Sequence, residues 1–114
     1  PCGIGTARGL MGFINHHQLP FRKTFKERNY WKLGHYVELG DGPYSMTAGW
    51  HTIEAIHGSR DWLGYEATKK PVTMRVMDFY LHDEGLIREN WVPIDIIHIL
   101  KQIGIDVLEL INIK

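Results

Sequence analysis

VTMRVMDFYLHDEGLIRENWVPIDIIHILKQIG, residues 72–104, is the stretch that decides the fold, because it combines two strands, a tight turn and a helix. Its first strand, residues 72–82, is rich in β-branched and aromatic side chains. Asp83-Glu84-Gly85 forms the turn, with glycine where a left-handed residue is often needed. A second strand follows over residues 86–94, and we expect a helix over residues 95–104.

The segment before this stretch predicts a helix at the start of the domain. Leu10, Phe13 and Ile14 have the spacing of an amphipathic helix, which we expect over residues 6–19. Pro20 should end or kink this helix, because proline lacks a backbone N–H group.

Two further strands are expected between this helix and residue 72. They run over residues 30–39 and 44–57, and the turn Gly40-Asp41-Gly42-Pro43 joins them. Gly49 in the middle of the second strand indicates a bulge or bend. The apolar tail, residues 105–114, is compatible with either a strand or a helix.

These elements predict one α+β domain over residues 1–114, with about four long antiparallel strands curved around the N-terminal helix. The curvature makes one face concave, so we expect a conical, hydrophobic pocket for a small hydrophobic molecule. The strands are apolar on both faces, which predicts that a second subunit covers the outer face in a homodimer. The chain opens at Pro1 without an initiator methionine, and we expect further structure upstream.

Composition excludes several classes of function. Lys plus Arg and Asp plus Glu both number 13 and no basic run is present, which argues against a nucleic-acid partner. The apolar runs are far shorter than the ~20 residues that a membrane span needs, and no signal peptide is evident. A single cysteine is typical of a reducing, cytoplasmic location.

Two segments resemble the SnoaL-like polyketide cyclases of the nuclear transport factor two-like superfamily, whose fold is also called cystatin-like. The run Gly85-Leu86-Ile87-Arg88-Glu89-Asn90-Trp91, followed by Asp95 and by Gln102-Ile103-Gly104, resembles the pattern that closes these cyclases. Residues 50–74 are also similar, although Lys69-Lys70 stands where the family usually has Gly-Lys and Ala67 stands where it has proline. The resemblance covers roughly residues 5–104, and the family's more N-terminal helices are absent.

This resemblance implies a cofactor-free enzyme that performs aldol cyclisation or isomerisation on a hydrophobic carbonyl compound. The role of general acid and base falls on Asp95 by resemblance, and Trp91 beside it becomes a pocket wall. A carboxylate in an apolar cavity has a raised pKa and can exchange a proton with a carbon acid. Asp95 also precedes a helix, where it would serve as an N-cap, and both interpretations can hold together.

Asp78 is a second candidate carboxylate, because it lies in the middle of an apolar strand and needs a partner. The structural alternative pairs it with an arginine or with Asn90. Whether it shares a face with Asp95 depends on the hairpin register, since one step flips the strand. A three-residue loop separates the two acids and a two-residue loop brings them together; the glycine at the third loop position favours separation.

His51 is the third catalytic candidate, as a group that orients a substrate carbonyl or supports Asp95. The seven histidines show no metal-binding spacing, and we expect neither a metal nor a cofactor. The remaining residues expected to line the pocket are Trp91, Trp50, His35, Tyr36, Met74 and Phe13. The alternative function is a non-catalytic ligand-binding or dimerisation module of the same fold.

Overall fold

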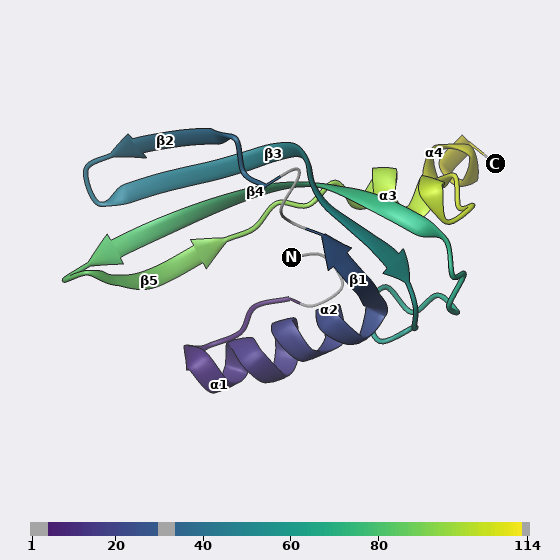
Figure 1. Ribbon diagram of the computed structural model, residues 1–114, viewed down its shortest axis with the longest axis horizontal. Helices are drawn as coiled ribbons and strands as arrows, with labels where there is room; N and C mark the ends of the chain where they lie inside the picture. Colours follow the sequence, from purple (N-terminus) through teal and green to yellow (C-terminus); the bar gives the residue numbers. More distant parts are fainter. Residues whose placement is uncertain (1–4, 30–33, 113–114) are drawn as a thin grey trace.

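The computed structural model describes residues 5–29 and 34–112. Its N-terminal helix consists of α1 (Gly9–Phe13), a π-helical turn η1 (Ile14–Gln18) and α2 (Leu19–Thr24). The helix lies across one side of the sheet (Figure 1). Pro20 does not end the helix, which continues to Thr24. The wider π turn before Pro20 makes room for its ring, which would clash with the preceding turn of a regular α-helix.

The sheet has five antiparallel strands: β1 (Phe25–Asn29), β2 (Val37–Asp41), β3 (Tyr44–His57), β4 (Pro71–Asp83) and β5 (Leu86–Trp91). Their order is β1-β3-β4-β5, and β2 pairs with the first half of β3. The long strands β3 and β4 form the curved centre (Figure 1). The strand predicted over residues 30–39 is reduced to residues 37–39 at the start of β2; residues 30–33 lie outside the described part.

The predicted bend at Gly49 is confirmed. The pairing of β3 with β4 shifts register between Gly49 and Ile53. A Cβ atom on Gly49 would clash with the carbonyl oxygen of Gly34 and lie 2.7 Å from the Thr52 hydroxyl. Only glycine fits this close approach of two backbones.

The residue pairing next to the turn of the β4–β5 hairpin is not the one that Gly85 favoured. The turn has two residues, because Asp83 pairs with Leu86. The register then shifts next to Leu81, which pairs with Glu89 and leaves Arg88 as the extra residue of a bulge. This bulge moves every later pair by one position.

The core lies at one end of the sheet, which we call the closed end. The helix α3 (Ile96–Gln102) packs there against the sheet and is followed by α4 (Val107–Asn112), so the apolar tail is helical. The side chain of Gln102 hydrogen-bonds both the N–H and the carbonyl of Thr73. It thereby covers the edge of β4 in the part of the strand that β5 does not reach. The buried core residues are Phe25, Ile53, Ala55, Trp62, Val72, Met74, Val76, Ile99, Leu100 and Ile103.

The other end of the sheet, which we call the open end, consists of β2, β5 and the adjoining halves of β3 and β4. These strands extend past the N-terminal helix (Figure 1). No helix in the described ranges is long and apolar enough to cross a membrane.

Candidate functional site

The face of β4 that turns toward the helix changes character along the strand. At the closed end this inner face carries the buried Met74 and Val76. At the open end the alternation continues with Asp78 and Tyr80, and Thr47 on β3 lies directly opposite Asp78. The inner face therefore passes from an apolar core to a row of polar groups, and the strands are not apolar on both faces as the sequence indicated.

Asp78 is the centre of this polar row. Its Oδ2 atom lies 3.5 Å from Nε2 of His35, and 15% of its side chain is exposed. The Nδ2 group of Asn90 donates to Oδ1 of Asp78 at 3.3 Å. The partner that the structural alternative required is thus present, together with a histidine that alternative did not include.

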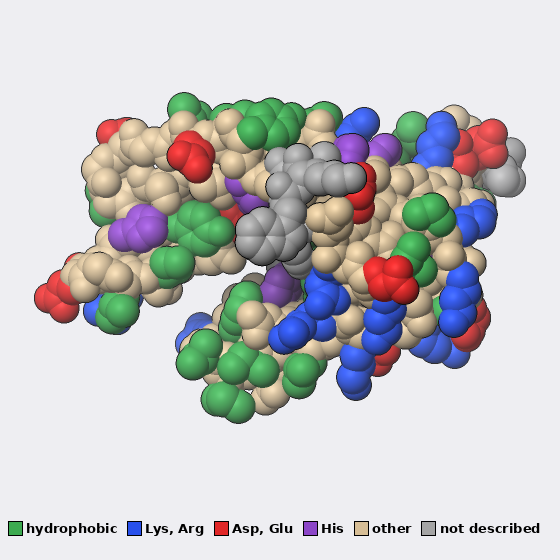
Figure 2. Space-filling view, viewed as in Figure 1, with side chains coloured by type: hydrophobic (Ala, Val, Ile, Leu, Met, Phe, Trp, Pro, Cys, Tyr) green, Lys and Arg blue, Asp and Glu red, His purple; other side chains and the backbone are tan. Residues whose placement is uncertain are grey.

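The N-terminal helix supplies a second histidine. Burial lowers the pKa of His17, and the negative charge of Asp78 acts in the opposite direction. The Nδ1 atoms of His17 and His35 are buried and have no hydrogen-bond partner among the described residues. Buried imidazole nitrogens of this kind can bond a ligand oxygen. The surface is notched between the helix and the β4–β5 hairpin (Figure 2).

Tyr80 extends the row toward the hairpin. Burial raises the pKa of its phenol, and the nearby charge of Asp78 raises it further. Side-chain hydrogen bonds join Tyr80 to Thr47 and to Asp78, and they act on the pKa in opposite directions. The hydroxyl group therefore stays protonated at neutral pH and can donate a hydrogen bond.

Asp95 lies on the opposite side of the sheet from Asp78. The backbone N–H of Asp95 donates to the carbonyl of Arg75, and the preceding residue, Ile94, pairs with Val76. Asp95 therefore lies on the same face of the sheet as Arg75, which is the face opposite to Asp78. Its Oδ1 atom accepts from the N–H of His98 as the N-cap of α3, and its Oδ2 atom lies 3.4 Å from Arg75. Both oxygens of Asp95 thus have structural partners.

Three aromatic residues expected to line the pocket, Trp91, Trp50 and Tyr36, lie on this outer face as well. Trp91 pairs with Phe79 and is 44% exposed. Trp50 stacks on the guanidinium of Arg75, and the hydroxyl of Tyr36 bonds the backbone of Trp50. A hollow of about 250 Å³ is lined by Trp50, Arg75, Met77, Pro93, Ile94 and Asp95.

The other three candidates are dispersed. Met74 is fully buried in the core. Phe13 stacks on His17, with their ring centroids 5.1 Å apart. Of these three residues, Phe13 is the one next to the polar row. His51 lies 3.7 Å from Glu54, which borders a hollow of about 550 Å³ near the closed end.

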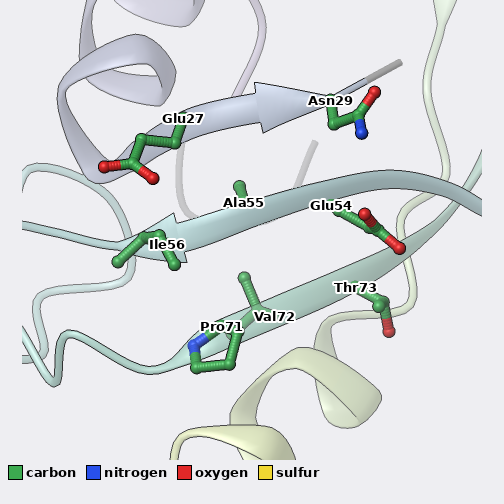
Figure 3. Close-up of a pocket in the computed structure, with 8 residues that line it drawn as sticks. All are labelled: Glu27, Asn29, Glu54, Ala55, Ile56, Pro71, Val72 and Thr73. Atoms are coloured by element: carbon green, nitrogen blue, oxygen red, sulfur yellow. The ribbon is translucent and has the colours of Figure 1, made fainter. Parts of the chain in front are cut away.

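This larger hollow runs along β3 between β1 and β4 (Figure 3). Its lining consists of Glu27, Asn29, Glu54, Ala55, Ile56, Pro71, Val72 and Thr73. Because Glu54 pairs with Thr73, both belong to the side of the sheet that carries Arg75 and Asp95. The predicted residues therefore fall into an inner group (Asp78, His35, Phe13 and Met74) and an outer group.

Neither His17 nor Tyr80 was among the site residues predicted from the sequence. One signal for His17 was available: Phe13, His17, Phe21 and Phe25 follow at intervals of four residues. Their rings form a continuous series along the helix, with centroid separations of 5.1, 6.0 and 5.1 Å. The described residues include no group of three or more His, Cys, Asp or Glu that could hold a metal ion.

Two solved structures have the same fold. TsrD from Streptomyces laurentii aligns with a TM-score of 0.61 and 18% identity, over 74% of this chain and 58% of its own. IdmH from Streptomyces antibioticus, for which a polyketide cyclase activity is proposed, aligns with a TM-score of 0.66 and 22% identity, over 89% of this chain and 68% of its own. No family model and no curated protein matches the sequence. The chain therefore has the nuclear transport factor two-like fold that the resemblance implied.

Proposed function

We propose that this protein is a cofactor-free enzyme that moves a proton on a small carbonyl compound, in an aldol cyclisation or an isomerisation. The observation that carries the proposal is the convergence of Asp78, His35 and His17 on the inner face, with Tyr80 beside them. A carboxylate next to hydrogen-bond donors is the combination that such a reaction requires.

The chemistry follows from these groups. The carboxylate of Asp78 takes a proton from the carbon next to the substrate carbonyl, and the C–H electron pair becomes a C=C bond. The negative charge moves to the carbonyl oxygen, where the Tyr80 hydroxyl or an imidazole N–H of His17 or His35 stabilises it. In a cyclisation the enolate carbon then attacks a second carbonyl of the same molecule, whose C=O π electrons move to oxygen, and the protonated Asp78 returns its proton to this alkoxide. In an isomerisation Asp78 returns the proton to a different carbon.

The lowered pKa of His17 suits this role. A neutral imidazole donates one N–H bond without adding a positive charge that would hold Asp78 permanently in an ion pair. Phe13, stacked on His17, offers an apolar surface for the remainder of the substrate. The resemblance assigns the acid–base role to Asp95, but that carboxylate caps α3 and pairs with Arg75 on the outer face. The histidines with unpartnered ring nitrogens, His17 and His35, lie on the side of Asp78, and this favours Asp78.

Exchange of carbon-bound protons tests the proposal. We expect the protein to accelerate deuterium incorporation next to the carbonyl of 2-tetralone, a flat bicyclic ketone, as followed by NMR in D₂O. Asp78→Asn should reduce the rate by roughly 100-fold or more, the size of a general acid–base contribution. Asp95→Asn is the matched control, because asparagine is also a good N-cap and the rate should stay near that of the wild type.

A reversed result, with Asp95→Asn inactive and Asp78→Asn active, would return the catalytic role to Asp95. A wild-type rate equal to that of buffer would contradict the acid–base function.

A second candidate function, a dimerisation module, is favoured by the apolar outer face of the open end. Four aromatic side chains there are about half exposed, and at 150–250 Å² each they present on the order of 400 Å². Valine and leucine side chains of β2 enlarge the patch toward the roughly 800 Å² that each partner of a stable interface buries. The exposed residues are Val37, Leu39, Tyr44, Trp50, Phe79 and Trp91.

We propose that a second copy of the chain covers this patch, and light scattering after size-exclusion chromatography tests the homodimer. Phe79→Glu should convert a dimer at micromolar concentration into a monomer, because it buries a charge in the interface. Leu10→Glu, at an exposed apolar position on α1, should leave the dimer intact. A wild-type monomer at this concentration would contradict the proposal. A dimer without proton-exchange activity would favour the module over the enzyme.

A further inference from the structure

A serine–histidine pair ends the polar row at the hairpin side of the inner face. The Oγ atom of Ser45 lies 2.7 Å from Nε2 of His82. Ser45 is on β3, directly opposite Tyr80, and His82 follows Tyr80 by two residues on β4, so these side chains share the inner face with Asp78.

The position of the pair is well defined by its surroundings. The backbone N–H of His82 donates to the carbonyl of Pro43 at 2.8 Å, which ties the β2–β3 turn to the end of β4. The His82 ring lies 6.0 Å from the ring of Tyr80. Asp78, Tyr80 and His82 thus stand at alternate positions, and at about 3.4 Å per strand residue the row is about 14 Å long.

The chemistry of the pair suits binding better than nucleophilic catalysis. In the described part of the chain no carboxylate forms a hydrogen bond or ion pair with His82, so the third member of a catalytic triad is missing. When the serine hydroxyl donates to Nε2, its oxygen retains free lone pairs and the Nδ1 atom of His82 carries a proton. The pair then offers both an acceptor and a donor, which is the complement of a hydroxyl group.

We infer that Ser45 and His82 form a second polar subsite, which binds a hydroxyl group at the far end of the carbonyl substrate. This inference rests on the proposed function, which holds the carbonyl end at Asp78. It narrows the substrate class to elongated, flat compounds with oxygen at both ends. Tyr80, between the two sites, lies under the middle of such a ligand.

Two ketones that differ by one hydroxyl group test the subsite. We expect the KM for deuterium exchange to be about five- to tenfold lower for 6-hydroxy-2-tetralone than for 2-tetralone, the gain typical of one hydrogen bond. Ser45→Ala and His82→Phe should abolish this preference, by raising the KM for 6-hydroxy-2-tetralone to that for 2-tetralone. Ser45→Thr keeps a hydroxyl group and should preserve it, as should His16→Phe, which alters an exposed histidine on the helix.

The outcomes separate the two proposals. If the wild-type protein exchanges neither ketone, the proposed function fails. If it exchanges both with the same KM, or if Ser45→Ala retains the full preference, the subsite is refuted while the acid–base function stands. Loss of kcat for both ketones in Ser45→Ala would also refute it, because a remote binding group should not alter the proton transfer.

Discussion

The two faces of the sheet at the open end are built from the same strands, yet they have opposite character. On the inner face Asp78 and Tyr80 contact polar groups, whereas on the outer face the alternating residues Met77 and Phe79 form an apolar surface. We propose proton chemistry for the inner face and a protein partner for the outer face. Successive side chains of β4 point to opposite faces of the sheet. The position of a residue along β4 therefore decides whether it can serve the inner face or the outer face.

The largest effect is expected when the two faces are exchanged at one point. In the double variant Met77→Asp/Asp78→Met the carboxylate moves to the outer face, so exchange of 2-tetralone protons should fall by about 100-fold or more. The charge in the apolar patch should also convert the proposed dimer into a monomer. Both effects are measurable on the same preparation, by NMR and by light scattering. Retention of full activity would mean that Asp78 is not the base.

A smaller effect is expected from pH, and it compares the closed end with the open end. Burial lowers the pKa of His57 at the closed end and of His17 at the open end below the ordinary value. Below about pH 6.5 the unfolded chain therefore binds more protons than the folded one, and the free energy of unfolding falls as the pH is lowered. The slope for one proton is at most about 1.4 kcal/mol per pH unit.

Urea unfolding at pH 8 and pH 5.5 measures this change. The stability should be higher at pH 8, and His57→Gln should reduce the difference because one of the two groups is then absent. Equal stability at the two pH values would show that His57 and His17 are not buried as neutral side chains.

The smallest effect is expected at Asp95 and sharpens the contrast between the two carboxylates. Asp95→Ala should lower the free energy of unfolding by about 1 kcal/mol, since it removes the N-cap of α3 and the partner of Arg75. Its rate of proton exchange, measured at a temperature where it is fully folded, should equal that of the wild type. A loss of more than tenfold would show that Asp95 takes part in the reaction.

Local features of the sequence predicted much of the fold. The bend at Gly49, the strand pair around residues 72–94 and the helix after Asp95 each carry a short-range signal in glycine, alternation or capping. The N-terminal helix was also evident from its spacing. Its passage through Pro20 was not, because the compensating π turn has no distinct residue pattern.

The site was harder to predict, because it depends on contacts between distant segments. The separation of Asp78 from Asp95 agrees with the arrangement that the turn favoured, but it arises from a two-residue turn plus a bulge at Arg88, and arginine is no marker of a bulge. In the strand expected over residues 30–39, alternation would place His35 and Val37 on one face. The strand begins only at Val37, however, so His35 is free to approach Asp78 while Val37 lies outside.

The π turn at Ile14–Gln18 sets the rotation of the helix segment before it relative to the segment after it. Each residue of an α-helix adds about 100° of rotation, so a one-residue deletion that converts this turn into regular α-helix would re-aim the segment before it. Phe21 and Phe25, which are anchored to Trp62, would stay in place. A one-residue insertion or deletion in this turn would therefore change which side chains border the notch between the helix and the β4–β5 hairpin, while the core remains the same.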